Sequence, residues 1–221
     1  MIFVEIIATV LVADFVSGLF HWLEDAYGRE DWPIVGRLVT RPNILHHHNP
    51  RYFTKHSWLR SSWLLLCLGV LVLGAAAICG VLTWQVWLVV ILGANANQMH
   101  KWAHRTPSEN GIFVSLLHRL RLIQTPKHHA AHHTDPKNSH YCVLTNLLNP
   151  ILDRARFWQG LEFLIRIVFR VERRIDTSVL HDAHGRAPSG QNLKPTDSKL
   201  LVRMDPNKKK LGDKYGISLG S

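Results

Sequence analysis

The sequence has no charged residue between Ser61 and Met99. This absence excludes an amphipathic surface helix there, because such helices carry charged residues on the face that contacts water. One membrane-spanning helix needs about 20 predominantly apolar residues. The segment is therefore long enough for two short spans joined by a turn near residues 80–85. A buried hairpin of a water-soluble core is the alternative, although such cores rarely need so long a run without charge.

Cysteine is scarce as well, with only Cys67, Cys79 and Cys142 in the chain. No two of them have the close CxxC spacing of cysteine-based zinc sites, and they do not form the dense pattern of small secreted domains. The sequence therefore indicates neither a disulfide framework nor a zinc finger.

The first 20 residues, MIFVEIIATVLVADFVSGLF, lack the basic residues that begin a signal peptide and carry Glu5 instead. We interpret them as a membrane helix that is retained. Asp14 is costly inside such a helix unless it faces the protein interior, which makes it a candidate functional residue. Three membrane spans are thus expected, at about 2–20, 62–80 and 84–99.

Positive charge is distributed unevenly between the expected spans. Residues 21–60 contain six lysines and arginines, whereas the connector at 80–85 contains none. Because positively charged segments favour the cytoplasmic side, residues 21–60 and 100–221 are both expected there. All 15 histidines fall in these two segments, so they can meet on one side of the membrane.

Two later segments, 111–124 and 157–174, alternate apolar and basic residues at helical spacing. We expect amphipathic helices that lie at the membrane interface, with ordinary packing helices as the alternative. From about residue 176 the chain becomes polar and basic. We therefore predict a membrane-embedded domain over 1–175 and a flexible tail over 176–221, with no nucleic-acid partner.

Histidines gather in four motifs, HWLED, HHH, HKWAH and HHAAHH. Spacings of three and four residues place side chains on one face of a helix. The stripes continue backwards to Asp14 and Asn97, which we expect to hydrogen-bond the imidazoles and fix their orientation. The candidate metal ligands are His21, Asp25, His46 or His47, His100, His104, His129, His132 and His133.

This set is large enough for two metal ions with open positions, because one catalytic zinc takes three protein ligands. Imidazole suits iron, zinc, copper and nickel, whereas a site with few carboxylates disfavours magnesium and calcium. A pH switch or a low-complexity histidine tract is the alternative, but such a tract would not keep helical spacings at span ends. The lone histidines His56, His118, His181 and His184 are interpreted as surface or core residues, and His48, His128 and His140 as neighbours of ligands rather than ligands.

Five stretches together resemble the lipid desaturase family, which contains plasmanylethanolamine desaturase and the plant fatty acid desaturase 4 group. They are ADFVSGLFHWLEDAYG, HHxNP at 46–50, NQMHKWAH, HAAHHTDP and HYCVLTNLLNPILD. The resemblance covers about residues 12–165 and is specific in its combination of motifs, because HxxHH alone occurs in many membrane di-iron enzymes. The chain departs from the pattern at TNLLN (145–149), where relatives tend to carry a glycine and an aromatic residue.

The resemblance implies a di-iron centre held by eight histidines, which would be His21, His46, His47, His100, His104, His129, His132 and His133. Asp25 matches the aspartate of the family's HWxxD motif. The implied fold is an all-α integral membrane protein of three to four transmembrane helices with interfacial helices and a cytoplasmic histidine-rich metal site. The implied activity is O₂-dependent desaturation of a lipid alkyl or acyl chain, with electrons from an external donor such as cytochrome b5 or ferredoxin.

Several alternatives stay open at this point. A membrane hydroxylase uses the same iron chemistry, a membrane zinc hydrolase differs in its metal, and a metal sensor or carrier would not catalyse a reaction. The double bond could create a vinyl ether from an ether-linked alkyl chain, or lie near the carboxyl end of an acyl chain. Charge alone suggests that Arg119, Arg121 and Lys127 lie near the lipid head group.

Overall fold

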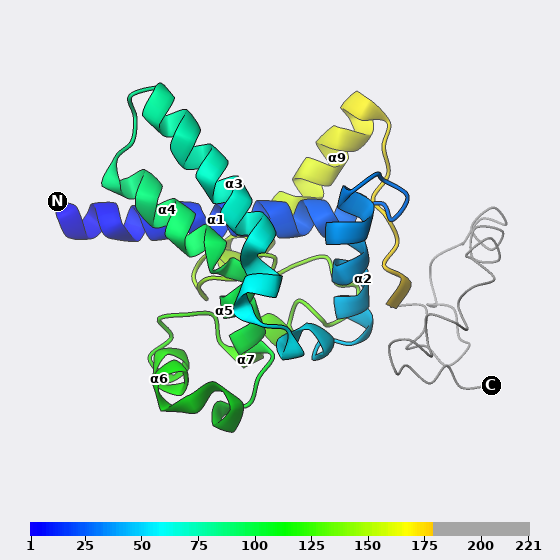
Figure 1. Cartoon of the computed structure of the whole chain (residues 1–221). Coiled ribbons are helices and arrows are strands. Elements are labelled where there is room, and N and C mark those ends of the chain that lie inside the picture. The colour runs from blue at the N-terminus through cyan, green and yellow to red at the C-terminus, as the bar shows by residue number, and fades with distance from the viewer. Residues whose placement is uncertain (179–221) are drawn as a thin grey trace, which may run out of the picture. The chain divides into compact units, whose positions relative to one another are not determined.

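The computed structural model describes residues 1–178. Most of the predicted tail, with His181 and His184, lies outside the described residues. Every regular element within residues 1–178 is a helix (Figure 1). The order is α1 (Ile2–Tyr27), η1 (Gly36–Thr40), α2 (Arg41–His48), η2 (Tyr52–Lys55), α3 (Trp58–Ile78), α4 (Trp84–Ala94), α5 (Ala96–Ala103), α6 (Pro107–Arg119), α7 (Pro126–Ala130), α8 (Leu148–Arg154) and α9 (Phe157–Phe169).

Helix α1 is longer than the expected span at 2–20, because it continues through the HWLED motif to Tyr27. Its first turns are apolar and largely exposed, whereas the polar stripe Asp14, Gly18, His21 and Asp25 is buried. The single helix α1 therefore has a mostly exposed apolar N-terminal half and a C-terminal half whose polar stripe is buried.

The prediction of one helical span over 84–99 is wrong, because α4 ends at Ala94 and α5 begins at Ala96. The Asn95 amide nitrogen donates to the Ile91 carbonyl at 2.9 Å, and the Asn95 oxygen accepts from the Trp58 indole N–H at 3.0 Å. An asparagine that bonds nearby backbone competes with the regular helix. Helix α5, which follows the break, carries His100, whose ring lies next to those of His21, His46 and His129.

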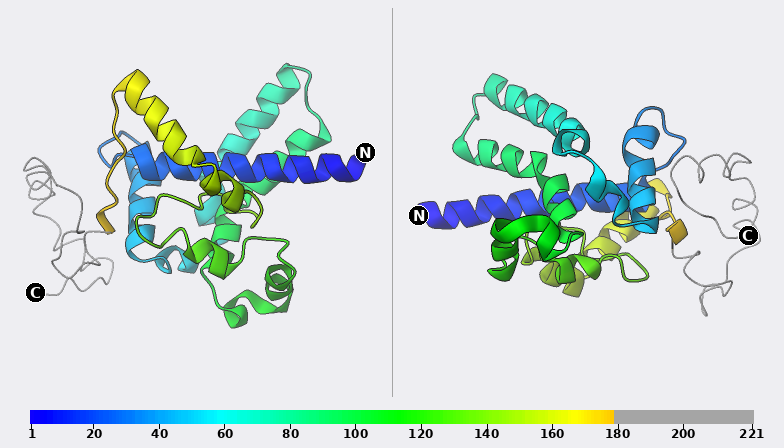
Figure 2. Two further views of the ribbon diagram at one scale, coloured as in Figure 1. Left: turned by 180° about the vertical axis from the view of Figure 1, so that it is seen from behind. Right: turned by 60° about the horizontal axis from the view of Figure 1, so that its bottom comes forward.

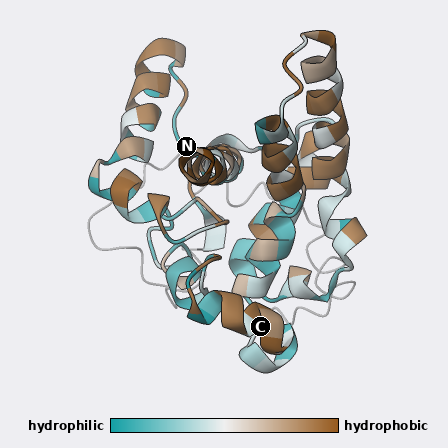
Figure 3. Cartoon of the chain, turned by 90° about the vertical axis from the view of Figure 1, so that its left-hand side faces the viewer, coloured by the Kyte–Doolittle hydropathy of each residue, from teal (hydrophilic) through white to brown (hydrophobic). Residues whose placement is uncertain are grey.

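Within residues 1–178, two helices are long and apolar enough to cross a membrane, α1 and α3, rather than the three to four expected. Helix α4, with 11 residues, is shorter than a span. In Figures 1 and 3, viewed at right angles, α9 and the α3–α4 hairpin extend toward the same side, and this upper side is rich in apolar residues.

The two predicted amphipathic segments are helical but bounded differently. Helix α6 begins at Pro107 with a Thr106–Glu109 capping box, bends at Gly111 (φ 73°) and ends at Arg119. Helix α9 ends at Phe169 because Arg170 adopts a left-handed conformation (φ 56°, ψ 32°). Both expose large apolar side chains: Ile112, Phe113 and Leu116 on α6, and Phe163, Leu164, Ile167, Val168 and Phe169 on α9.

An irregular segment, residues 137–147, connects two small cores. Its Tyr141 and Cys142 pack with Trp22 and Trp158 in one core, and its Val143 and Leu144 pack with α1, α4 and α5 in the other. Gly18 permits this approach to α1, since a Cβ there would lie 2.6 Å from the Cys142 sulfur. Figure 2 shows this segment as loops between α7 and α9, alongside α1.

Candidate metal centre

All nine predicted ligands meet in the buried polar part of the chain, where they form two groups. Within each group, the potential ligand atoms lie within 4.8 Å of one another. Group A consists of His46, His100, His104, His129 and His133, and group B consists of His21, Asp25, His47 and His132. Spacing along helices, together with the family resemblance for the pair His46 and His47, thus identified side chains that come together, but neither indicated how they divide into two groups.

The division separates consecutive residues. His46 belongs to group A and His47 to group B, because adjacent residues at the end of α2 point about 100° apart around the helix. Helix α7 ends at Ala130, so His132 and His133 lie on the turn that follows it and also go to different groups. The ring centroids of His46 and His47 are 5.8 Å apart, and those of His132 and His133 are 5.2 Å apart. The two groups are therefore neighbours.

Group B has a defined ring orientation for each histidine. His21 Nδ1 lies 3.0 Å from the Tyr141 carbonyl oxygen, and His132 Nδ1 lies 2.8 Å from the Ser139 carbonyl oxygen. His47 Nδ1 contacts the Asp176 carboxylate. Since these oxygens only accept, each Nδ1 must carry the proton when it bonds them. The Nε2 atoms then face the Asp25 carboxylate, at 3.4 Å for both His47 and His132, and are the ring atoms available to a metal ion.

Group A contains two close pairs of ring nitrogens. His100 Nε2 and His104 Nε2 are 3.2 Å apart, as are His129 Nε2 and His133 Nε2. The His46 ring lies next to both pairs, with centroid distances of 4.6 Å to His100 and His104 and 4.7 Å to His133. In group B, His47 Nε2 and His132 Nε2 are 3.3 Å apart. Two nitrogens bound to one ion at about 2.1 Å lie roughly 3.0–3.4 Å apart, so these separations fit shared metal ligation.

Several buried ligand atoms have no hydrogen-bond partner among the described residues. They are His21 Nε2, Asp25 Oδ2, both ring nitrogens of His46, His129 Nδ1 and His133 Nδ1. A buried polar atom without a partner is costly, and a metal ion would satisfy those that face one another. The donor set, eight imidazoles and one carboxylate, suits a transition metal such as iron or zinc.

The electrostatics of group A keep its imidazoles neutral. Burial, followed by repulsion from neighbouring imidazoles, lowers the pKa of His104 to about 3 and that of His46, His100 and His129 well below the usual range. Neutral imidazole is the form that binds a metal. Burial also disfavours the charged form of His47, but the nearby Asp25 and Asp176 carboxylates outweigh burial and raise its pKa.

The predicted roles of Asp14 and Asn97 are wrong, because neither side chain bonds an imidazole. The Asp14 carboxylate accepts from the Leu144 and Thr145 backbone N–H groups at 2.8 and 3.2 Å and from the Thr145 hydroxyl at 2.5 Å. Asn97 donates to the Ser61 carbonyl at 2.6 Å and so links α5 to α3. Asp14 instead fixes the segment whose Tyr141 carbonyl orients His21.

The TNLLN segment also helps to hold the 137–147 segment in place. The Asn149 side chain bonds both backbone groups of Cys142 at 2.9 and 2.8 Å, and the Asn146 oxygen accepts from the Thr125 N–H at 3.0 Å. These contacts tie the start of α7 and the start of α8 to the 137–147 segment. The departure from the family pattern therefore falls on residues that shape the loops around the centre.

The other histidines within residues 1–178, which we did not predict as ligands, lie outside both groups. His48 contacts the Thr177 hydroxyl at 3.0 Å, and His140 pairs with Asp153 at 2.9 Å. Sequence reasoning missed three ring partners, namely the carbonyls of Ser139 and Tyr141 and the carboxylate of Asp176. The carbonyls have no residue-type signal, and Asp176 is 129 positions from His47 in the chain.

Three known proteins that are similar to this chain are all described as desaturases. A model described as the lipid desaturase domain matches residues 10–176. Plasmanylethanolamine desaturase 1 of Mus musculus is 33% identical over 178 residues, 75% of this chain and 65% of that protein. Plasmanylethanolamine desaturase of Myxococcus xanthus is 34% identical over 163 residues, 70% of this chain and 57% of that protein.

A plant relative, chloroplastic fatty acid desaturase 4 of Arabidopsis thaliana, is 30% identical over 160 residues, 71% of this chain and 49% of that protein. The chain thus spans about half to two thirds of the length of these relatives. No solved structure matches. Because the family match covers most of the chain and both histidine groups lie within it, the chain belongs to the lipid desaturase family.

Proposed function

We propose that this chain is a membrane-bound, O₂-dependent lipid desaturase that holds two iron ions, one in group A and one in group B. The observation that carries the proposal is the pairing of two adjacent ligand groups built from nine side chains, of which seven are buried and two, His104 and His133, are partly buried. A single-metal hydrolase needs three protein ligands, and a transient carrier does not need ligands held by fixed backbone contacts.

The bound ions would supply, with O₂ and external electrons, the oxidant that removes hydrogen from an unactivated C–H bond. The residues of the chain orient the ligands and exclude water. His21, His47 and His132 each keep a proton on Nδ1 and present Nε2. Asp25 adds a negative charge to group B, whereas group A is neutral. The ligands of groups A and B thus differ in charge, which would give the two ions different properties.

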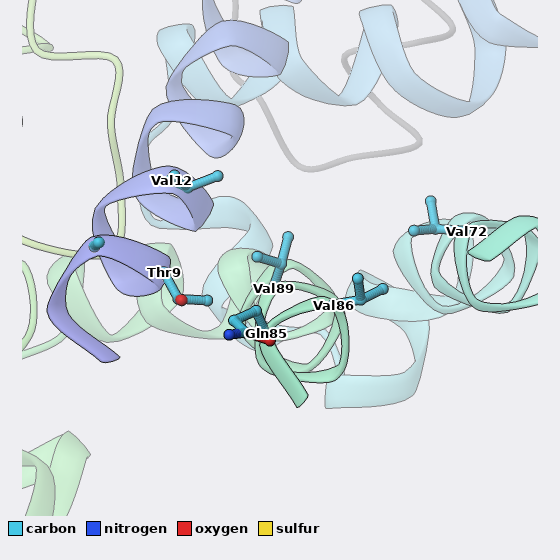
Figure 4. Close-up of a pocket in the computed structure, with 7 residues that line it drawn as sticks. Thr9, Val12, Val72, Gln85, Val86 and Val89 are labelled. Atoms are coloured by element: carbon cyan, nitrogen blue, oxygen red, sulfur yellow. The ribbon is translucent and has the colours of Figure 1, made fainter. Parts of the chain in front are cut away.

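A lipid chain would reach the centre from the bilayer. An apolar groove of about 350 Å³ lies between α1, α3 and α4, lined by Thr9, Val12, Val72, Gln85, Val86 and Val89 together with Ala8 (Figure 4). Val12 precedes His21 by nine residues of α1, or about 13.5 Å along the helix. This length is close to half of the bilayer's hydrocarbon thickness of about 30 Å. The groove would therefore hold the distal part of a chain that reacts at the centre.

The head group would lie near Arg119, Arg121 and Lys127, which are all exposed. Their positive charge and the position of Lys127, two residues before His129, support this placement. We expect Arg119→Ala and Arg121→Ala to raise the KM for a phospholipid substrate and to leave kcat little changed. An unchanged KM in both variants would remove this assignment.

The relatives' names favour an ether lipid as substrate, with formation of a vinyl ether, because two of them are plasmanylethanolamine desaturases. An acyl chain is the alternative, since another relative is a fatty acid desaturase. Electrons would come from a separate donor such as cytochrome b5 or ferredoxin. The histidine groups would face the cytoplasm.

Elemental mass spectrometry of protein purified in detergent tests the metal, and lipid mass spectrometry tests the reaction. We expect two irons per chain and, with O₂ and a reductant, a product lighter than the substrate by two hydrogens. A product heavier by one oxygen would indicate a hydroxylase. Zinc that ferrous iron cannot replace, with no oxygen consumption, would contradict the desaturase and favour a hydrolase.

A further inference from the structure

The chain returns to the metal centre after α9. The Arg174 backbone N–H donates to the Ala26 carbonyl at 2.7 Å, and the Arg174 guanidinium donates to the Asp25 carbonyl at 3.1 Å. Arg173 pairs with Glu162 of α9 at 2.5 Å. These contacts hold residues 173–178 across the end of α1 that carries Asp25.

Asp176 points from this segment into group B. One carboxylate oxygen contacts His47 Nδ1. The other accepts from the Ser178 backbone N–H at 2.8 Å and from the Ser178 hydroxyl at 2.6 Å. The Asp176 side chain is only 10% exposed, so water does little to screen its contact with His47. The carboxylate is thereby held in one orientation by three donors.

The hydroxyl of Ser178 is held in turn. It accepts from the Lys137 ammonium at 2.7 Å, and both residues are buried. Lys137 lies on the same loop as Ser139, whose carbonyl orients His132. Contacts therefore run from Lys137 through Ser178 and Asp176 to His47. They connect the loop that orients His132 to a second histidine of group B, His47.

We propose that Asp176 is a positioning residue for the metal in group B, acting through His47. The inference rests on the proposed function only in that His47 must be a ligand. A carboxylate that accepts from Nδ1–H fixes the tautomer, orients the ring and makes Nε2 a stronger donor to a metal. His47 Nε2 faces Asp25 and His132 at 3.4 and 3.3 Å, as a shared ion requires.

A purely structural role is the rival explanation, in which Asp176 only fastens the 173–178 segment. Metal affinity distinguishes the two roles. If Asp176 only holds the 173–178 segment in place, its replacement would lower the stability of the fold and leave metal binding by His47 unchanged. Asp176→Asn is the suitable variant, since it keeps the size of the side chain and removes its charge. Asp153→Asn is a matched control, because Asp153 pairs with His140, which lies outside both groups.

The experiment uses the full chain in detergent, freed of metal with a chelator and titrated anaerobically with Co²⁺, whose visible absorption reports ligand geometry. We expect wild type and Asp153→Asn to bind two ions. In Asp176→Asn one of the two sites should weaken by roughly 10- to 100-fold and its absorption bands should shift. Thermal unfolding without metal shows whether each variant folds, and Asp176→Ala gives a second, stronger test.

Unchanged affinity and absorption in both Asp176 variants, with normal binding by wild type, would overturn the positioning role and leave the proposed metal centre standing. A wild-type chain that binds no cobalt would overturn the proposed function and the positioning role with it. Equal weakening in the Asp153→Asn control would also overturn the assignment, since the effect would not be specific to His47.

Discussion

At the scale of single residues, neighbours in sequence have different tasks. His47 lies in group B between two carboxylates, whereas His48 lies outside both groups. We expect His47→Ala to lose the metal of group B, because the ion loses a ligand and Asp25 loses one of the two imidazoles that lie 3.4 Å from its carboxylate. His48→Ala should keep both metals. Metal content after gel filtration checks this pair, and equal loss in the two variants would contradict the division of the HHH motif.

Residue spacing was a good guide where the partners share a helix or a turn. His21 and Asp25, and His100 and His104, were placed together by their separation of four residues, and both pairs meet in the structure. Asp176 could not be found in this way, because the return of the chain after α9 depends on packing between distant segments. Asp14 was noticed for the right reason, its cost in an apolar helix, but its partners are two backbone N–H groups and the Thr145 hydroxyl, 131 positions away in the chain, and spacing along the sequence does not reveal them.

At the scale of helices, the sequence predicted the apolar elements but not their breaks. The uncharged run from Ser61 to Met99 does contain two antiparallel helices. The break at Asn95 was missed because asparagine is tolerated in helices unless a partner such as Trp58 holds its side chain. The C-terminal ends of α6 and α9 were missed because Arg121 and Arg170, both in left-handed conformations, end the two helices without a glycine to signal it.

The groove between α1, α3 and α4 provides a test at this scale. Val72 lines the groove, whereas Val70, on the same helix, is 69% exposed. We expect Val72→Trp to fill part of the groove and to shift activity toward lipids with shorter chains, with little change for the shortest. Val70→Trp should behave as wild type. Competition between substrates of different chain length measures the preference, and an identical preference in all three proteins would exclude the groove from the lipid path.

At the scale of the whole molecule, burial of so many imidazoles couples stability to pH. The pKa of all five group A histidines lies below the value of about 6.5 in an unfolded chain. Below that pH the unfolded chain gains protons that the folded, metal-free protein does not bind. Its stability should therefore fall as the pH falls through about 6.5, by up to about 1.4 kcal/mol per pH unit and histidine.

His47 opposes this trend, because its raised pKa stabilises the fold at low pH, but it is one residue against five. Thermal unfolding of the metal-free protein between about pH 8 and pH 5 measures the balance. We expect the melting temperature to decrease steadily on the acid side of about pH 6.5. A melting temperature that is constant or rises toward pH 5 would contradict the neutral state of group A.

Two pairs of consecutive residues, His46–His47 and His132–His133, are divided between the groups. In each pair one side chain belongs to group A and the other to group B. A single peptide unit, with a fixed Cα separation of about 3.8 Å, thus bridges the groups twice. The distance between the two ions would be set chiefly by covalent bonds, and much less by the packing of helices. When the helices move relative to one another, the pair of ions would move as one body and keep its internal dimensions.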